Sequence, residues 1–201
     1  MRIRIDEVDF ALPEGAGNDK KSIFEAVKRE VLGRNRVISQ VIVDGNPLDD
    51  QDLFCTLAAG AETQFVTQPI RELVAQSMDE GTNYVPLLKS GLESVATDFE
   101  AGRDGEAMGK FTQAVEGINW LISVFDRSCI LLGVTTDMLA SGRFDKDMGD
   151  MRNALEEMTA AMENGKNMAL AYLIREKLLP AIDRFSLYWS EVSSQLDTPL
   201  Q

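Results

Sequence analysis

Apolar residues recur every three or four positions from Gly105 to Val134 and predict one long helix. At ~3.6 residues per turn, this stretch makes about eight turns. Its main apolar face comprises Met108, Phe111, Val115, Ile118, Ile122, Phe125, Cys129 and Leu132. A second stripe on the opposite side comprises Trp120, Val124, Leu131 and Val134. A helix that is apolar on two sides has to be covered on two sides, which predicts the central helix of a bundle.

Three further stretches have the helical period, and they surround this central helix in sequence. They cover residues 70–101, 144–162 and 167–196. Short glycine-containing turns join the first two helices and the last two, so each pair should run antiparallel. We therefore expect an up-down-up-down four-helix bundle over residues 69–196, followed by a flexible tail over 197–201.

Two prolines interrupt these helical patterns. Gly81 and Pro86 leave open whether residues 70–101 form one kinked helix or two helices that meet. Pro180 should kink the last helix, because it leaves the carbonyl of Glu176 without its usual backbone donor.

The first 68 residues have a different pattern and predict a separate small domain. Alternating residues from Arg2 to Asp6 predict a strand, which Val8, Phe10 and Leu12 extend or pair with. Ile23, Phe24, Val27, Val31 and Leu32 then mark a helix, and PEGAGN before it (13–18) is typical of a loop. The β-branched stretch RVISQVIV (36–43) predicts a strand that ends at the turn Asp44-Gly45. Residues 64–67 predict a last short strand, after an acidic cluster at 49–52 and a helical turn at 53–57.

This succession resembles the plan of ubiquitin-like domains. The matching segments are MRIRID, the helix, VIVDGNPLDDQDL with Leu48 as its apolar anchor, and TQFVTQ. The resemblance implies a β-grasp fold and a binding or docking role. It does not imply conjugation, because the chain continues into a helix where a Gly-Gly end would stand. The expected fold class is therefore α+β: a small β-grasp-like domain over residues 1–68, followed by an antiparallel four-helix bundle.

Charge narrows the range of partners. The formal net charge is −13 and the sequence pI is about 4.4, with lysine and arginine scattered along the chain. Such a surface repels nucleic-acid phosphates and anionic membranes, so neither is an expected partner. The start of the chain has no signal-peptide pattern, and no apolar run reaches the ~18 residues of a membrane span. The cysteines, Cys55 and Cys129, lie in apolar contexts typical of buried thiols, so we expect a cytoplasmic protein.

The sequence carries no strong catalytic signature. It contains no histidine, which excludes Ser-His-Asp and Cys-His nucleophile systems and the Glu-x-x-His di-iron sites of helical bundles. GAGNDKKS (15–22) approaches a phosphate-binding loop but has Lys20 where the second glycine belongs. Residues 145–156 approach a calcium loop, but the glycine is one place early and one ligand is missing. We expect no metal, no cofactor and no enzymatic activity.

Surplus apolar helix surface predicts a protein-interaction function instead. One candidate surface is the stripe of Trp120, Val124, Leu131 and Val134. The other is a methionine-rich face with Met148, Met151, Met158 and Met162, which alternatively faces the bundle core. The bundle resembles small bacterial helical chaperones and adaptors, including flagellar export chaperones. The expected function is binding of an apolar or helical segment of another protein. The alternatives are a structural homodimer with the extra stripe as its seam, and an enzyme or small-ligand binder at the seam between the domains.

Overall fold

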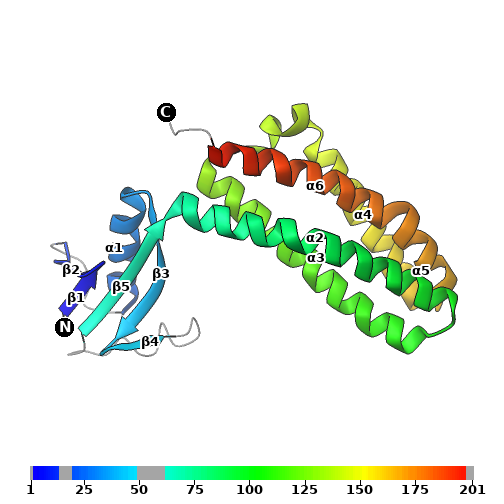
Figure 1. Cartoon of the computed structure of the whole chain (residues 1–201), viewed down its shortest axis with the longest axis horizontal. Helices are drawn as coiled ribbons and strands as arrows, with labels where there is room; N and C mark the ends of the chain where they lie inside the picture. The colour runs from blue at the N-terminus through cyan, green and yellow to red at the C-terminus, as the bar shows by residue number, and fades with distance from the viewer. Residues whose placement is uncertain (1, 14–19, 49–61, 198–201) are drawn as a thin grey trace. The chain divides into compact units, whose positions relative to one another are not determined.

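The computed structural model describes residues 2–13, 20–48 and 62–197 and is an α+β protein. The chain divides into two compact units, Met1–Leu73 and Val74–Gln201, here called the first unit and the helical unit. The expected combination of an N-terminal mixed sheet and a C-terminal helical region is confirmed (Figure 1). Several expected features lie outside the described residues: most of the loop at 13–18, the acidic cluster at 49–52, the helical turn at 53–57, and the tail beyond Asp197.

The first unit is built on a five-stranded mixed sheet in the order β2-β1-β5-β3-β4. β1 pairs antiparallel with β2 and parallel with β5, whereas β3 pairs antiparallel with both β4 and β5. The turn between β1 and β2 uses two non-glycine residues with positive φ, Asp6 and Glu7. The strands and the helix are β1 (Arg2–Ile5), β2 (Val8–Asp9), α1 (Lys20–Gly33), β3 (Arg36–Val43), β4 (Asn46–Leu48) and β5 (Glu62–Pro69).

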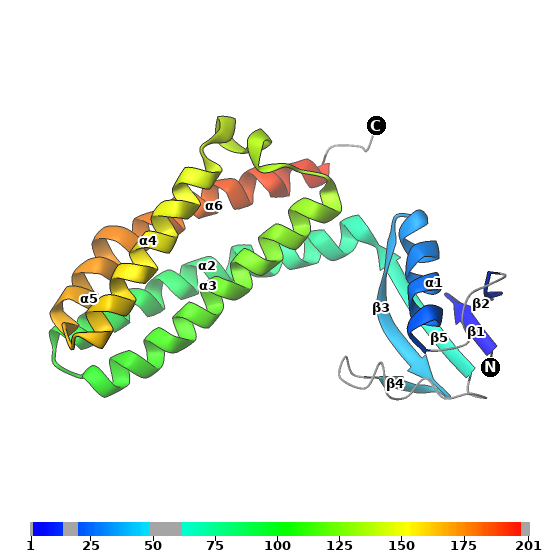
Figure 2. The same ribbon diagram turned by 180° about the vertical axis from the view of Figure 1, so that it is seen from behind.

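One helix covers one face of this sheet. Alternation along β1 places Ile3 and Ile5 on the inner face, and Phe65 of β5 joins them there. On α1, Ile23, Val27 and Val31 recur at four-residue spacing and meet those strand residues in a common core. Figures 1 and 2 show α1 lying against the sheet. The pattern of apolar positions thus explains both the sheet register and the docking of α1.

The helical unit consists of long helices joined by short turns. The α-helices are α2 (Ile70–Glu100), α3 (Asp104–Leu132), α4 (Phe144–Glu163), α5 (Asn167–Leu173) and α6 (Leu179–Ser194). A π-helical segment, η2 (Ile174–Leu178), separates α5 from α6, and 3-10 segments occupy Thr136–Gly142 and Gln195–Asp197. α2 and α3 lie side by side, and α4 packs against α5 and α6 (Figures 1 and 2). None of the helices in the described ranges has the length and hydropathy needed to cross a membrane.

The two prolines have different consequences. α2 is one continuous helix with Pro86 inside it, which answers the question that the sequence left open. Because Pro86 has no amide hydrogen, the carbonyl of Thr82 lacks its α-helical donor. Both residues are exposed, so water can donate a hydrogen bond to that carbonyl instead. Near Pro180, the Leu179 amide instead donates five residues back, to the carbonyl of Ile174. The expected single last helix is therefore divided into α5, η2 and α6. The described part of the helical unit thus has five α-helices, α2 to α6, where the sequence predicted four.

Aromatic rings from three helices make the centre of the helical unit. Phe125 of α3 lies 5.3 Å from Phe144 and 5.1 Å from Phe185, measured between ring centroids. Trp189 of α6 joins the group at 6.2 Å from Phe125. All four side chains are buried, which confirms that the main apolar face of the central helix points into a core.

Candidate functional site

The helical unit has an open, partly apolar groove between α2 and α3. Two adjoining hollows of about 350 and 500 Å³ run along these helices and share Tyr84 and Gln113 as lining residues. We call them together the α2–α3 groove. Its apolar wall comprises Tyr84, Leu87, Leu88, Ala114 and Trp120. Leu87 is 69% exposed and Trp120 is 39% exposed, whereas Leu88 and Ala114 are buried, so Leu87 and Trp120 are the exposed apolar side chains of this wall.

An aromatic pair shapes one end of the groove. The rings of Tyr84 on α2 and Trp120 on α3 meet edge to face, with centroids 5.6 Å apart. Gly117 makes this arrangement feasible, because a Cβ at that position would lie only 2.0 Å from the Tyr84 hydroxyl oxygen. The absence of a side chain at Gly117 therefore lets the tyrosine lie across α3 and support the indole of Trp120.

The two ends of the groove differ in charge. Glu80 and Glu116 line the end that holds the aromatic pair, and Lys110 lines the other end. Lys110 donates to the buried carboxylate of Asp98 at 2.6 Å, and Arg103 donates to the same carboxylate at 3.0 Å. The hydrogen bonds from Lys110 and Arg103 lower the pKa of Asp98, despite its burial. The single negative charge of Asp98 is thus shared by Lys110 and Arg103, and these three side chains together leave one positive charge at the far end.

The structure brings one member of the predicted Trp120 stripe into this groove. Trp120 lines it, whereas Val124, Leu131 and Val134 are half-buried and do not belong to its lining. The α2 side of the groove, with Tyr84 and Leu87, was missed by sequence reasoning. Its signal was available, because Tyr84, Leu87 and Leu88 follow the same three- and four-residue spacing as the α3 stripe.

The methionine-rich face lies mostly inside the helical unit. Met151 and Met158 are only 2% and 1% exposed, and Met148 and Met162 are half-buried. The reason is that α4 packs this side against α5 and α6. A partner therefore cannot reach Met151 or Met158 in this conformation.

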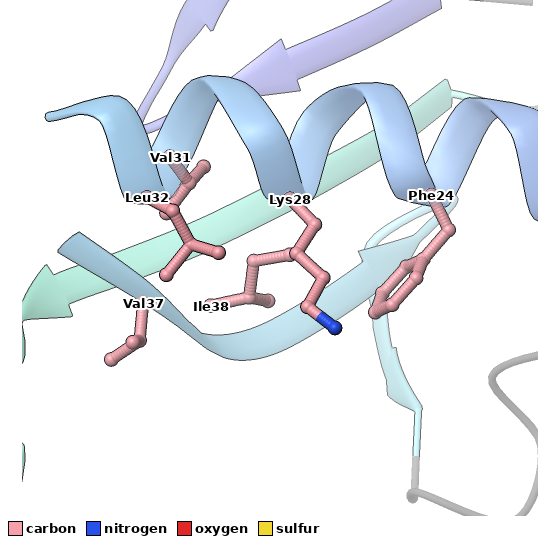
Figure 3. A pocket seen from close by; sticks show the side chains of 6 residues that line it. All are labelled: Phe24, Lys28, Val31, Leu32, Val37 and Ile38. Atoms are coloured by element: carbon pink, nitrogen blue, oxygen red, sulfur yellow. The ribbon is translucent and has the colours of Figure 1, made fainter. Parts of the chain in front are cut away.

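The first unit has a smaller apolar pocket between α1 and β3 (Figure 3). It has a volume of about 220 Å³, and Phe24, Leu32 and Ile38 point into the space between the helix and the strand. Lys28 of α1 also lines the pocket, and its amine is the charged group in the lining. The pocket is thus an apolar hollow beside one cationic side chain.

Two potentially nucleophilic side chains of the helical unit, Cys129 and Tyr188, have raised pKa values and are protonated at neutral pH. Burial, with a smaller effect of Asp126, raises the pKa of the Cys129 thiol to about 11. Burial and a hydrogen bond to Asp147 raise the pKa of Tyr188 to about 12. Among the residues that the structure describes, no group of three or more Cys, Asp or Glu side chains is arranged to hold a metal ion. Cys55 lies outside that part of the chain.

Comparison with known protein families finds one match. Residues 76–187, more than half of the chain, match the family described as Domain of unknown function (DUF8042). This range includes the whole α2–α3 groove and excludes the sheet of the first unit. No curated protein and no solved structure matches the chain.

Proposed function

The chain belongs to the DUF8042 family, and from the groove that lies within the matched residues we propose that it is a non-enzymatic protein-interaction protein. It acts as an adaptor or chaperone-like protein that holds an apolar, helical segment of another protein. The α2–α3 groove is the binding surface. The observation that carries the proposal is the exposure of Leu87 and Trp120 in a groove between two long antiparallel helices.

The composition of the groove is typical of protein-binding surfaces. Aromatic residues with a polar tip, such as Tyr84 and Trp120, supply contact area at a low cost in side-chain entropy. Leu87 is available as an anchor because it extends into solvent from α2. A groove between two helices fits an amphipathic helix, which inserts side chains at three- and four-residue spacing.

The proposal extends to the fold of each unit. The first unit is a β-grasp, ubiquitin-like module that serves as a second docking element. The sheet order, the parallel pairing of β1 with β5 and the placement of α1 between β2 and β3 support this interpretation. Residues 69–196 form an antiparallel four-helix bundle in which α5, η2 and α6 act as one helix. The right-handed helical dihedral angles of Leu173, Ile174, Leu178 and Leu179 support this continuity.

Alanine variants of two equally exposed leucines test the proposal, because one leucine lies in the groove and the other serves as a control outside it. Leu87 on α2 is 69% exposed and lies in the groove, whereas Leu187 on α6 is 70% exposed and lies outside it. The intact chain serves as bait in its native lysate, and a partner captured specifically is then purified. We expect Leu87→Ala and Trp120→Ala each to weaken its binding by about ten-fold or more, whereas Leu187→Ala leaves the affinity unchanged. Equal affinity for all three variants would remove the groove from the function.

A structural homodimer with the Trp120 stripe as its seam is the second candidate. The exposed apolar area around Trp120 and Leu87 is the observation that favours it. In this case sedimentation would detect a dimer that Trp120→Ala dissociates. A monomer at high micromolar concentration would contradict it.

A further inference from the structure

Charge along the α2–α3 groove points to the chemistry of its occupant. At the aromatic end, Glu80 from α2 and Glu116 from α3 flank Tyr84 and Trp120. Neither carboxylate makes an ion pair with any residue in the described ranges. At the other end, the amine of Lys110 is held by Asp98. The groove therefore presents negative charge that is not neutralised, concentrated at one end.

The same end has the aromatic faces that attract cations. An ammonium or guanidinium group is drawn to the face of a tryptophan or tyrosine ring, and the attraction grows as water is excluded. Here the two rings are held in a fixed mutual orientation, at an interplanar angle of 87°. Two carboxylates beside an aromatic pair make a suitable site for the side chain of a lysine or an arginine.

The rest of the groove is lined mainly by residues that favour apolar side chains on the occupant. Leu87, Leu88 and Ala114 line the section that follows the aromatic pair. From Glu80 to Ser94, the α2 wall extends for about 21 Å at 1.5 Å per residue. An occupant helix of about 14 residues covers this length, and its apolar face would meet the exposed Leu87 while one basic residue meets the aromatic end.

We propose that the occupant of the α2–α3 groove is a basic amphipathic helix, whose cationic side chain lies against Tyr84 and Trp120 between Glu80 and Glu116. This inference rests on the proposed function and adds the charge of the partner segment. A second copy of this chain fits poorly, because each copy carries a formal net charge of −13. The groove thus selects a positively charged segment of a different protein.

Two synthetic peptides test the charge preference. Both are 18-residue amphipathic helices with the same leucine face, and the polar positions hold lysine in one and glutamate in the other. Calorimetric titration of the intact chain should give at least about ten-fold tighter binding of the lysine peptide at low salt. A lysine peptide of the same composition in scrambled order controls for attraction to an acidic surface.

Variants then assign the preference to the groove. We expect Glu80→Gln/Glu116→Gln to reduce the preference for the lysine peptide about ten-fold. The matched control, Glu156→Gln/Glu163→Gln, changes the net charge equally at exposed positions of α4 and should leave the preference unchanged. Trp120→Ala should weaken binding of the lysine peptide as well.

The outcomes separate this inference from the proposed function. Equal affinity for the lysine and glutamate peptides, both lost in Leu87→Ala, would overturn the charge inference and leave the groove as a binding surface. Equal losses in the two glutamate double variants, or equal binding of the scrambled peptide, would also overturn it. Absence of binding by either helical peptide would count against the proposed function itself.

Discussion

Two glycines in the helical unit leave room for aromatic side chains from neighbouring helices. At Gly81 of α2, a Cβ would lie only 2.0 Å from a ring carbon of Trp189 on α6. At Gly117 of α3, it would meet Tyr84 at the same distance. Trp189 also donates its indole N–H to the carbonyl of Met78 at 3.0 Å. Each ring therefore occupies the space that a side chain on the neighbouring helix would otherwise fill.

We expect Gly81→Ala to destabilise the helical unit by about 3 kcal/mol, the upper part of the usual range for overpacking. The reason is that the indole of Trp189 cannot move away without losing its hydrogen bond to Met78. Gly91→Ala on the same helix is the control, because its Cβ would meet nothing within 4 Å. That variant should gain about 1 kcal/mol from helix propensity. Urea unfolding measures both, and a neutral Gly81→Ala would show that Trp189 repacks freely.

Residue patterns predict the core better than they predict these contacts. The spacing of Phe111, Ile118 and Phe125 correctly indicates a buried face, because burial follows helical periodicity. Gly81 looks like a place for a kink when only its own helix is considered. Its packing against Trp189 depends on a residue 108 positions later, which no local pattern of α2 contains.

At the scale of elements, the carboxylate of Asp98, near the end of α2, stabilises the turn between α2 and α3. The N-cap residue of α3 is Arg103, which makes no side-chain cap hydrogen bond. Asp98, buried at the end of α2, binds Arg103 and Lys110 instead. Gly102 turns the chain with a φ of 72°, so backbone geometry and ion pairing together set the hairpin.

We expect Asp98→Asn to lower the urea midpoint of unfolding at pH 7, since it removes the charge that holds both cations. The pKa of Asp98 lies below its ordinary value of 3.8, so its contribution is complete above about pH 4 and is lost as the pH falls further. The difference between the variant and the original chain should therefore shrink by pH 3. Asp183→Asn, which removes an exposed pair with Lys89, is the control and should have little effect. A constant difference between pH 7 and pH 3 would contradict the electrostatic explanation.

Helices can be located from the sequence, but a groove between helices cannot. Periodicity identifies Trp120 as surplus apolar surface, yet its neighbours on α2 depend on how two helices pack. Packing also decides that Val124, Leu131 and Val134 are half-buried rather than part of the groove. Likewise, the amide that Pro180 lacks predicts an irregular helix, but not the π-helical form that it takes.

At the scale of the whole molecule, the two units have separate cores. The core of the first unit is an α1–sheet cluster that includes Ile23, Val27 and Phe65. The core of the helical unit gathers around Phe125 and other residues after Val74. Composition and pattern indicate this division, because the period of the apolar residues changes from strand-like to helical near Ile70.

A fragment of residues 70–201 tests whether the helical unit is stable by itself. Because its ring cluster uses only its own residues, we expect helical circular dichroism and a cooperative thermal transition. Its midpoint should lie within ~4 °C of the helical transition of the intact chain, a shift that corresponds to about 1 kcal/mol or less. A fragment without a cooperative transition would show that the first unit is needed for the helices to fold.

The contrast between the two tryptophans has a practical consequence for spectroscopy. Trp120 is 39% exposed, whereas Trp189 is 3% exposed beside Gly81. Acrylamide should therefore quench the native fluorescence of Trp120 and leave that of Trp189 almost intact. The unlabelled protein thus carries one optical reporter of groove occupancy and a second reporter of its own unfolding.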